Sequence, residues 1–427
     1  MQYDSTTSLS GTLRVMGFSG TDEVATSRMV LTKQKLGSDV TVKLVEGSLD
    51  TQQLLSQIAT GNPPDLIYIG RDKVGSLAAR GAILPLENCV AGEKIDTSQY
   101  VPSALAQVTL NGKIYGIPEF NVVQITMANK NLLQEAHVSI SDVNGSNREA
   151  MTAAAKSLYS LQGQGSDLIG VDSKIPEFLP LWVKAAGGDL ISKDGKKAQL
   201  NSPQTIAALS WAAHIYEEQG GFSRIKSIRD SADTFGDKNQ FASGTLGAMP
   251  MEQWYINTLN SVSPKAPMAF DTVRNLKGKT IAFASGSAWA IPKGAKNPKA
   301  ACRWARAMTS TQAWEKAADT RLASRNKSGQ VFTGLLTGNI VADRKIRAMV
   351  TAKQSPWSDA VEAMYEANDH TFSMPANPAD AEFTAAWQEA VGKVLNKELS
   401  VKQALDAAQK TAQKALDDGW ASIDSEG

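Results

Sequence analysis

The first eighty residues alternate short apolar runs with amphipathic segments, and this alternation constrains the fold more than any other feature. We predict strands at residues 13–18, 40–45 and 65–69, with helices at 51–60 and 72–80. The third apolar run has no polar alternation, as expected of a central parallel strand. Strands and helices that alternate through short turns are typical of a parallel α/β sheet with right-handed crossovers.

The chain is too long for one ordinary hydrophobic core. Its 427 residues predict two lobes of roughly 150 to 250 residues each. Further strands are expected at 114–118, 246–249 and 280–284. Helices are expected in four later segments: 151–161, 203–219, 298–308 and 401–416.

Composition excludes several classes of protein. Lysine plus arginine number 44 and aspartate plus glutamate 43, so the formal charge of +1 gives no support for a nucleic-acid groove or a polybasic membrane patch. The sequence contains no run of 18 apolar residues, so we predict no transmembrane span. The three histidines and two cysteines have no ligand-like spacing, so we predict no metal site and no cofactor.

Cys89 and Cys302 are the only thiols, and they can form a disulfide only if the fold brings them together. The interpretation that we favour is two unpaired, buried side chains, since Cys302 lies in a helical run. The polar N-terminus lacks the pattern of a signal peptide. The chain is therefore either cytoplasmic or a mature form to which Met1 was added.

Polar turns follow the predicted strands of the first lobe. Ligands of open α/β sheets lie beyond the carboxyl ends of the strands. The turns that follow strands 13–18 and 65–69 therefore supply the first candidate ligand contacts, which are Phe18, Ser19, Thr21, Asp22, Arg71 and Asp72.

Three aromatic residues follow strand-like segments and are predicted to lie in loops. Trp254, Tyr255 and Trp289 lie outside the helical apolar stripes to which Trp304 and Trp314 belong. Flat aromatic surfaces beside carboxylates and amides suit a sugar, which has apolar C–H faces and hydroxyl edges.

No known catalytic motif is present. The sequence lacks a phosphate-binding loop, a Gly-rich dinucleotide fingerprint, a nucleophile elbow and a zinc-protease helix. Paired carboxylates for glycoside hydrolysis remain open, because two acids distant in sequence can meet in space. The candidates for that chemistry are Asp22, Asp72, Glu119 and Glu252.

Five blocks of sequence carry a family likeness. They read QQLLSQIATGNPPDLIYIGRDKVGSLAARGAILPLENCV, LNGKIYGIPEFNVVQITMANKNLL, FASGTLGAMPMEQWYI, GSAWAIPKGAKNPKAACRWARAMTS and VLNKELSVKQALDAAQ. In this order, over about 350 residues, the chain resembles the carbohydrate-binding solute-binding proteins of bacterial ABC importers, which include the maltose-binding proteins. One departure is Ala128, because the family usually has tyrosine before Asn129-Lys130; this places the ligand's identity in doubt.

The resemblance implies an α/β clamp of two lobes, with no enzymatic activity. The first lobe would comprise residues 1–118 plus 264–322, and the second 119–263 plus 323–427. The chain would cross between lobes near Pro118, within 263–279 and within 322–326. Family positions in the cleft would correspond to Arg71, Asp72, Glu119, Asn121, Trp254, Trp289 and Arg325.

The resemblance further implies a monomer that binds a mono- or oligosaccharide and delivers it to a membrane permease. The protein would be extracellular or periplasmic, and anchored as a lipoprotein. Two alternatives stay open. One is a receptor of the same fold for another small polar solute, such as a phosphorylated polyol, a peptide or a polyamine. The other is a secreted carbohydrate-active enzyme.

Overall fold

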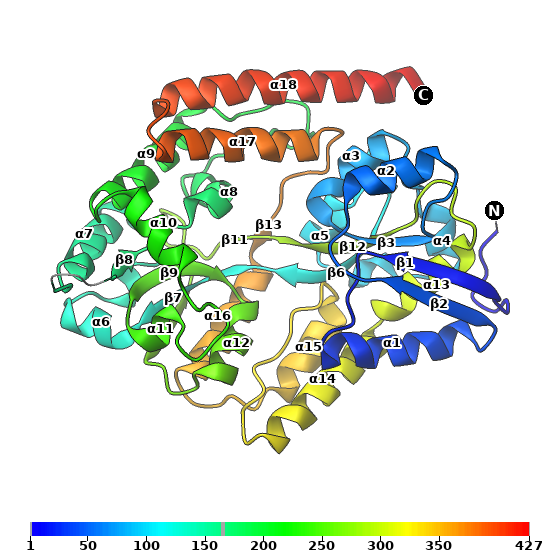
Figure 1. Cartoon of the computed structure of the whole chain (residues 1–427), viewed down its shortest axis with the longest axis horizontal. Helices are drawn as coiled ribbons and strands as arrows, with labels where there is room; N and C mark the ends of the chain where they lie inside the picture. Colours follow the sequence, from blue (N-terminus) through cyan, green and yellow to red (C-terminus); the bar gives the residue numbers. More distant parts are fainter. Residues whose placement is uncertain (1, 164–166, 427) are drawn as a thin grey trace.

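The computed structural model describes residues 2–163 and 167–426. Figure 1 shows two bodies side by side, each a β-sheet with helices on its faces, joined by extended segments. None of the helices in the described ranges is long and apolar enough to cross a membrane.

The first lobe is built on a five-stranded sheet with the strand order β2-β1-β3-β12-β6. Its central strand pairs are parallel, β1 with β2 and β1 with β3, which confirms the predicted parallel core. Strand β12 is antiparallel to both of its neighbours. The strands are β1 (Gly11–Met16), β2 (Val40–Val45), β3 (Leu66–Gly70), β6 (Ile117–Val122) and β12 (Ser285–Ala290).

Helices cover both faces of the first sheet, and a separate apolar cluster fills the space on each side. The predicted helix after Asp50 is confirmed, because the Asp50 carboxylate accepts a hydrogen bond from the Gln53 amide as an N-cap. The helices and short elements of this lobe are α1 (Glu23–Leu36), α2 (Thr51–Ala59), η1 (Arg71–Lys73), α3 (Val74–Ala79), α4 (Glu87–Gly92), η2 (Thr97–Gln99), α5 (Pro102–Gln107), β4 (Thr109–Leu110), β5 (Lys113–Ile114), α13 (Pro298–Met308) and α14 (Thr311–Lys327).

The second lobe contains a four-stranded sheet with the order β10-β7-β9-β8. Its strands are β7 (Gln124–Asn129), β8 (Ile169–Val171), β9 (Leu246–Glu252) and β10 (Met268–Thr272). One large apolar cluster joins this sheet to its helices. These elements are α6 (Lys130–Glu135), η3 (Ile140–Asp142), α7 (Arg148–Tyr159), α8 (Ile175–Ala185), α9 (Pro203–Glu217), α10 (Phe222–Asp230), α11 (Gln240–Ser243), α12 (Trp254–Val262), α16 (Trp357–Asp369), α17 (Asp380–Leu395) and α18 (Val401–Glu426).

The chain passes between the two sheets at three places. The first is Val123, between β6 and β7. The second is 273–284, which includes β11 (Ala282–Phe283), a strand that pairs with β13 (Thr371–Phe372). The third is 328–356, which contains α15 (Ile340–Met349).

The predicted lobe boundaries differ from the observed lobes in three places, one of which is α14, a helix of the first lobe that the predicted boundary after residue 322 divides. Met268–Thr272 pairs with β7 of the second sheet, whereas the predicted boundary puts it in the first lobe. Strand β6 continues to Val122 and pairs with β12, so residues 119–122 belong to the first sheet rather than the second lobe. The boundaries were implied by the family resemblance, which does not specify the backbone pairing or the helix ends of this chain.

The two cysteines form a disulfide, so the favoured interpretation of unpaired thiols is wrong. Cys89 lies in α4 and Cys302 in α13, with their Cα atoms 5.9 Å apart. Both are buried in the same core cluster of the first lobe. Their separation of 213 residues gives no sequence signal for the pairing.

Candidate ligand-binding cleft

A cavity of about 470 Å³ lies between the two lobes. Its walls come from the first lobe through Arg71, Asp72 and Ser285–Ser287, and from the second through α8 and α17. The remaining lining residues that matter here are Gln107, Gln124, Pro176, Glu177, Phe178, Glu252, Phe283, Met374, Asp380, Phe383, Thr384, Trp387 and Gln388.

Strand ends from both sheets meet at this cavity. Arg71 and Asp72 follow the carboxyl end of β3, and Glu252 is the last residue of β9. This is where ligands bind in open α/β sheets. The predicted candidates Arg71, Asp72 and Glu252 are therefore brought together, two from one lobe and one from the other.

Arg71 is a buried residue that lines the cavity. Its guanidinium donates to Gln107 Oε1 and Asn121 Oδ1, each at 2.9 Å, and to the Phe120 and Ser285 carbonyl oxygens. Burial lowers the pKa of Arg71 to about 9. Its nitrogens are thus occupied by neutral acceptors from α5, β6 and β12 of the first lobe.

Asp380 links the two lobes at the edge of the cavity. Its carboxylate accepts from the backbone amides of Gly75 and Ser76, at 2.7 and 3.0 Å, across the start of α3. Burial raises the pKa of Asp380 to about 7, and the charge of Asp72 adds to that effect. Gly75 is needed for this approach, because a Cβ there would lie 2.2 Å from the Asn377 carbonyl oxygen.

Helix α17 supplies much of the cavity wall, and the sequence reasoning missed it. Phe383, Thr384, Trp387 and Gln388 all line the cavity from this helix. Their spacing of three and four residues marks one helix face and could have identified the stripe. It could not have shown that this face meets the other lobe.

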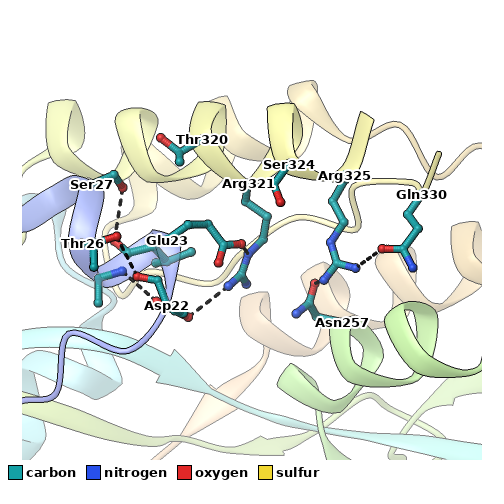
Figure 2. Close-up of polar contacts among 12 residues, drawn as sticks. Asp22, Glu23, Thr26, Ser27, Asn257, Thr320, Arg321, Ser324, Arg325 and Gln330 are labelled. Carbon is teal, nitrogen blue, oxygen red and sulfur yellow. Dashed lines mark hydrogen bonds and ion pairs between the residues drawn. The ribbon is translucent and has the colours of Figure 1, made fainter. Parts of the chain in front are cut away.

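A second inter-lobe cavity of about 280 Å³ contains two further candidates, Asp22 and Trp254. Figure 2 shows Arg321 of α14 pointing to the start of α1 and Arg325 of the same helix pointing to α12. Arg321 pairs with the Asp22 carboxylate at 3.0 Å and with Glu23 at 2.7 Å. The last turns of α14 therefore bridge the two lobes.

Trp254 lies between the two cavities. It is the first residue of α12 rather than a loop residue, and its side chain is 36% exposed. Its indole N–H donates to Glu252, which lines the first cavity. Phe235, which is 67% exposed, stacks on Trp254 with ring centroids 6.0 Å apart.

Five predicted candidates are buried in the interior. Phe18 and Trp289 stack in the core of the first lobe, where Trp289 lies in β12 and not in a loop. Glu119 is fully buried and pairs with Arg28 at 2.9 Å. The fourth is Asn121, whose side-chain oxygen accepts a hydrogen bond from Arg71. The fifth is Tyr255, which lies in α12 rather than in a loop and whose hydroxyl donates to the Thr234 carbonyl oxygen at 2.8 Å.

Three candidates lie near the cleft without lining either cavity. The Ser19 hydroxyl accepts from the Gly47 amide at 3.1 Å, and Thr21 is exposed in the same turn. Arg325 donates to Asn257 of α12 and to Gln330 Oε1, the latter at 2.8 Å (Figure 2). These contacts hold loops and helices in place.

The carboxylates considered for hydrolysis are divided among three places. Asp72 and Glu252 share the first cavity, Asp22 lies in the second and Glu119 is buried. Within residues 2–163 and 167–426, no group of three or more metal-ligating side chains is found.

Comparison with known sequences identifies a family. A family model described as bacterial extracellular solute-binding protein matches residues 31–328. A maltooligosaccharide ABC transporter solute-binding lipoprotein of Streptococcus pneumoniae is 26% identical over 66% of this chain and 64% of its own. A maltodextrin-binding protein of Bacillus subtilis is also 26% identical, over 64% of each chain. The chain thus spans less than two thirds of the length of these relatives.

Solved structures share the fold over nearly the whole chain. An ABC substrate-binding protein from Listeria monocytogenes in complex with cycloalternan superposes with a TM-score of 0.76 at 17% identity, covering 96% of this chain and all of that one. A protein solved with mannobiose bound has a TM-score of 0.72 at 22% identity, over 94% and 99%. These neighbours confirm the two-lobed α/β fold.

Proposed function

The chain belongs to the family of bacterial extracellular solute-binding proteins, and on that premise we propose that it is the carbohydrate receptor of an ABC importer. It captures a mono- or oligosaccharide between its lobes and delivers it to a membrane permease. The relatives named for maltooligosaccharide and maltodextrin binding support this assignment. The family description supports an extracellular location, and the Streptococcus pneumoniae relative, named as a lipoprotein, supports a lipid anchor.

The single observation that carries the proposal is the first inter-lobe cavity. Strand ends of both sheets supply polar groups to it, while Phe283 and the edges of the buried side chains of Phe178, Phe383 and Trp387 supply apolar surface. Aromatic faces pack against sugar C–H groups, and carboxylates and amides accept from hydroxyls. A cavity that draws on both lobes suits a ligand that must contact both.

Transport requires that ligand change the arrangement of the lobes. We place the hinge at Val123, 273–284 and 328–356, where the chain passes between the sheets. A ligand shifts an open–closed equilibrium only by its differential affinity for the two states. Contacts from Asp72 on one side and Glu252 and α17 on the other would therefore form together only in the closed state.

The alternatives of another solute or an enzyme receive less support. A phosphorylated ligand would need free cationic donors, but those of Arg71 are already engaged by neutral acceptors. The relatives are binding proteins, and on that basis we propose that the chain releases its ligand unaltered.

A thermal-shift screen against neutral sugars, phosphosugars, peptides and polyamines tests the proposed function. We expect stabilisation by one or a few sugars, since a ligand that binds only the folded state raises the unfolding temperature. Product analysis of every hit by chromatography is expected to return the sugar unchanged. Stabilisation by a phosphosugar alone, or a cleaved product, would overturn the assignment.

Replacing Trp254 with alanine is expected to weaken sugar binding at least tenfold while the protein remains folded. The side chain is partly exposed in the second cavity, and its indole N–H donates to Glu252 of the first. Its loss therefore removes stacking surface, worth roughly 1–3 kcal/mol for an aromatic contact, and frees Glu252 without opening the core. Isothermal titration calorimetry measures the change. Trp211→Ala is the matched control, because Trp211 is half-buried and lines neither cavity. Equal affinities for the two variants would refute a ligand contact at Trp254.

A further inference from the structure

The first cavity is strongly acidic, although the chain as a whole carries a formal charge of only +1. Four carboxylates line it, Asp72, Glu177, Glu252 and Asp380, against one cationic side chain, Arg71. The excess of negative charge is therefore local to the cavity and not a property of the whole surface.

Glu177 and Arg71 do not account for this excess. The negative charge of Glu177 is balanced by ion pairs with Arg229 and with Lys174, the latter at 3.5 Å. Arg71 contributes one positive charge to the lining of the cavity, but its N–H groups already donate to neutral oxygen atoms and to no carboxylate. The other three acids, Asp72, Glu252 and Asp380, therefore accept no hydrogen bond from the Arg71 guanidinium.

Asp72 and Glu252 come from opposite lobes. Among the described residues neither forms an ion pair, although Arg71 lies close enough to Asp72 for their charges to interact. Asp72 is exposed after β3, and Glu252 accepts only the indole N–H of Trp254 at the end of β9. Closure around a neutral guest would bring these two like charges into a drier space, which costs free energy.

Asp380, the third of these acids, is likewise held without a cationic partner. Its oxygens are held by neutral donors, the Gly75 and Ser76 amides and the Ser76 hydroxyl. Its pKa is raised to about 7, chiefly by burial and further by the charge of Asp72. A neighbouring cation would lower that pKa and stabilise the carboxylate.

The second cavity provides an internal contrast. Its carboxylate, Asp22, pairs with Arg321, which lines the same cavity. Charge is therefore balanced in the second cavity and unbalanced in the first, although both lie between the same two lobes.

We infer that the first cavity binds an amino sugar, whose ammonium group contacts Asp72 of one lobe and Glu252 of the other. An ammonium offers three hydrogen-bond donors and one positive charge, which suits two carboxylates that approach from opposite sides. The sugar ring packs on Phe283 and on the apolar lining beside it. This inference rests on the proposed function and narrows its ligand class from carbohydrates in general to cationic ones.

Matched sugar pairs test the inference by isothermal titration calorimetry with the full chain. Within each pair amino groups replace hydroxyls. Glucosamine and glucose, galactosamine and galactose, and mannosamine and mannose differ at one position, and the glucosamine disaccharide and cellobiose differ at two. In at least one pair the amino sugar is expected to bind at least tenfold more tightly, roughly the effect of one charge-assisted hydrogen bond. Raising the salt concentration is expected to narrow the difference.

Charge-removing variants place the effect at the two acids. Asp72→Asn and Glu252→Gln are each expected to reduce the preference for the amino sugar at least tenfold, with little change in affinity for its neutral partner. Glu382→Gln is the control, because Glu382 is an exposed residue of α17 that pairs with Arg80 and lines neither cavity. A preference that survives both cavity variants would overturn the inference.

The remaining outcomes separate the inference from the proposed function. Equal, salt-independent affinity within every pair that binds would overturn the inference and leave the carbohydrate receptor intact. Tight binding of spermidine or putrescine, with no binding of any amino or neutral sugar, would overturn both.

Discussion

Glu119→Ala is expected to lower the free energy of unfolding by about 3–5 kcal/mol, because it leaves the charge of Arg28 buried without its partner. Glu119 and Arg28 are both fully buried, and their carboxylate and guanidinium groups lie 2.9 Å apart. Glu119 also accepts the indole N–H of Trp289, so the substitution leaves a second donor unsatisfied. Urea denaturation measures the change.

The exposed pair Arg80–Glu382 is the control for this prediction. Both of its side chains are about half exposed, so Glu382→Ala is expected to cost no more than about 1 kcal/mol. Sugar affinity of folded Glu119→Ala should equal that of the unmodified chain, since Glu119 lines neither cavity. Similar unfolding energies for the two alanine variants would contradict the structural role assigned to Glu119.

Removing the disulfide is expected to destabilise the first lobe by about 2–5 kcal/mol. The bond joins residues 213 positions apart, so its loss frees a long segment of the unfolded chain. The double variant Cys89→Ala/Cys302→Ala, followed by differential scanning calorimetry, measures the effect. Reduction with dithiothreitol should lower the unfolding temperature of the unmodified chain but not of the variant.

Two outcomes would count against this account of the disulfide. One is an unfolding temperature that is the same in the variant and the unmodified chain. The other is a thiol assay that finds two free cysteines in the unfolded, unreduced protein. Because both cysteines lie in the first lobe, the stability of the second lobe, measured without sugar, should change little.

The sequence was sufficient to predict the parallel core of the first lobe. Three strands and the helices between them have clear periodicity, and the Asp50 cap and the helix at 298–308 were predicted at their observed positions. The predicted helix at 401–416 begins at the observed residue but continues to Glu426. Local periodicity does not specify which strand pairs with which. Neither the antiparallel strand β12 nor β10 of the second sheet was predicted from the sequence.

The candidate site was predictable only where it follows a strand. Asp72 and Glu252 line the first cavity because strand ends of α/β sheets face the ligand. Trp289 was interpreted as a loop residue because polar neighbours precede it, yet it continues strand β12 into the core. The wall supplied by α17 depends on the packing of two lobes, which no local pattern encodes.

Small-angle X-ray scattering with and without a saturating sugar tests the central claim most directly. If the lobes close on a ligand held between them, the radius of gyration decreases when the sugar is added. A radius of gyration that is unchanged at saturation, with binding verified by calorimetry on the same sample, would contradict capture by hinge closure.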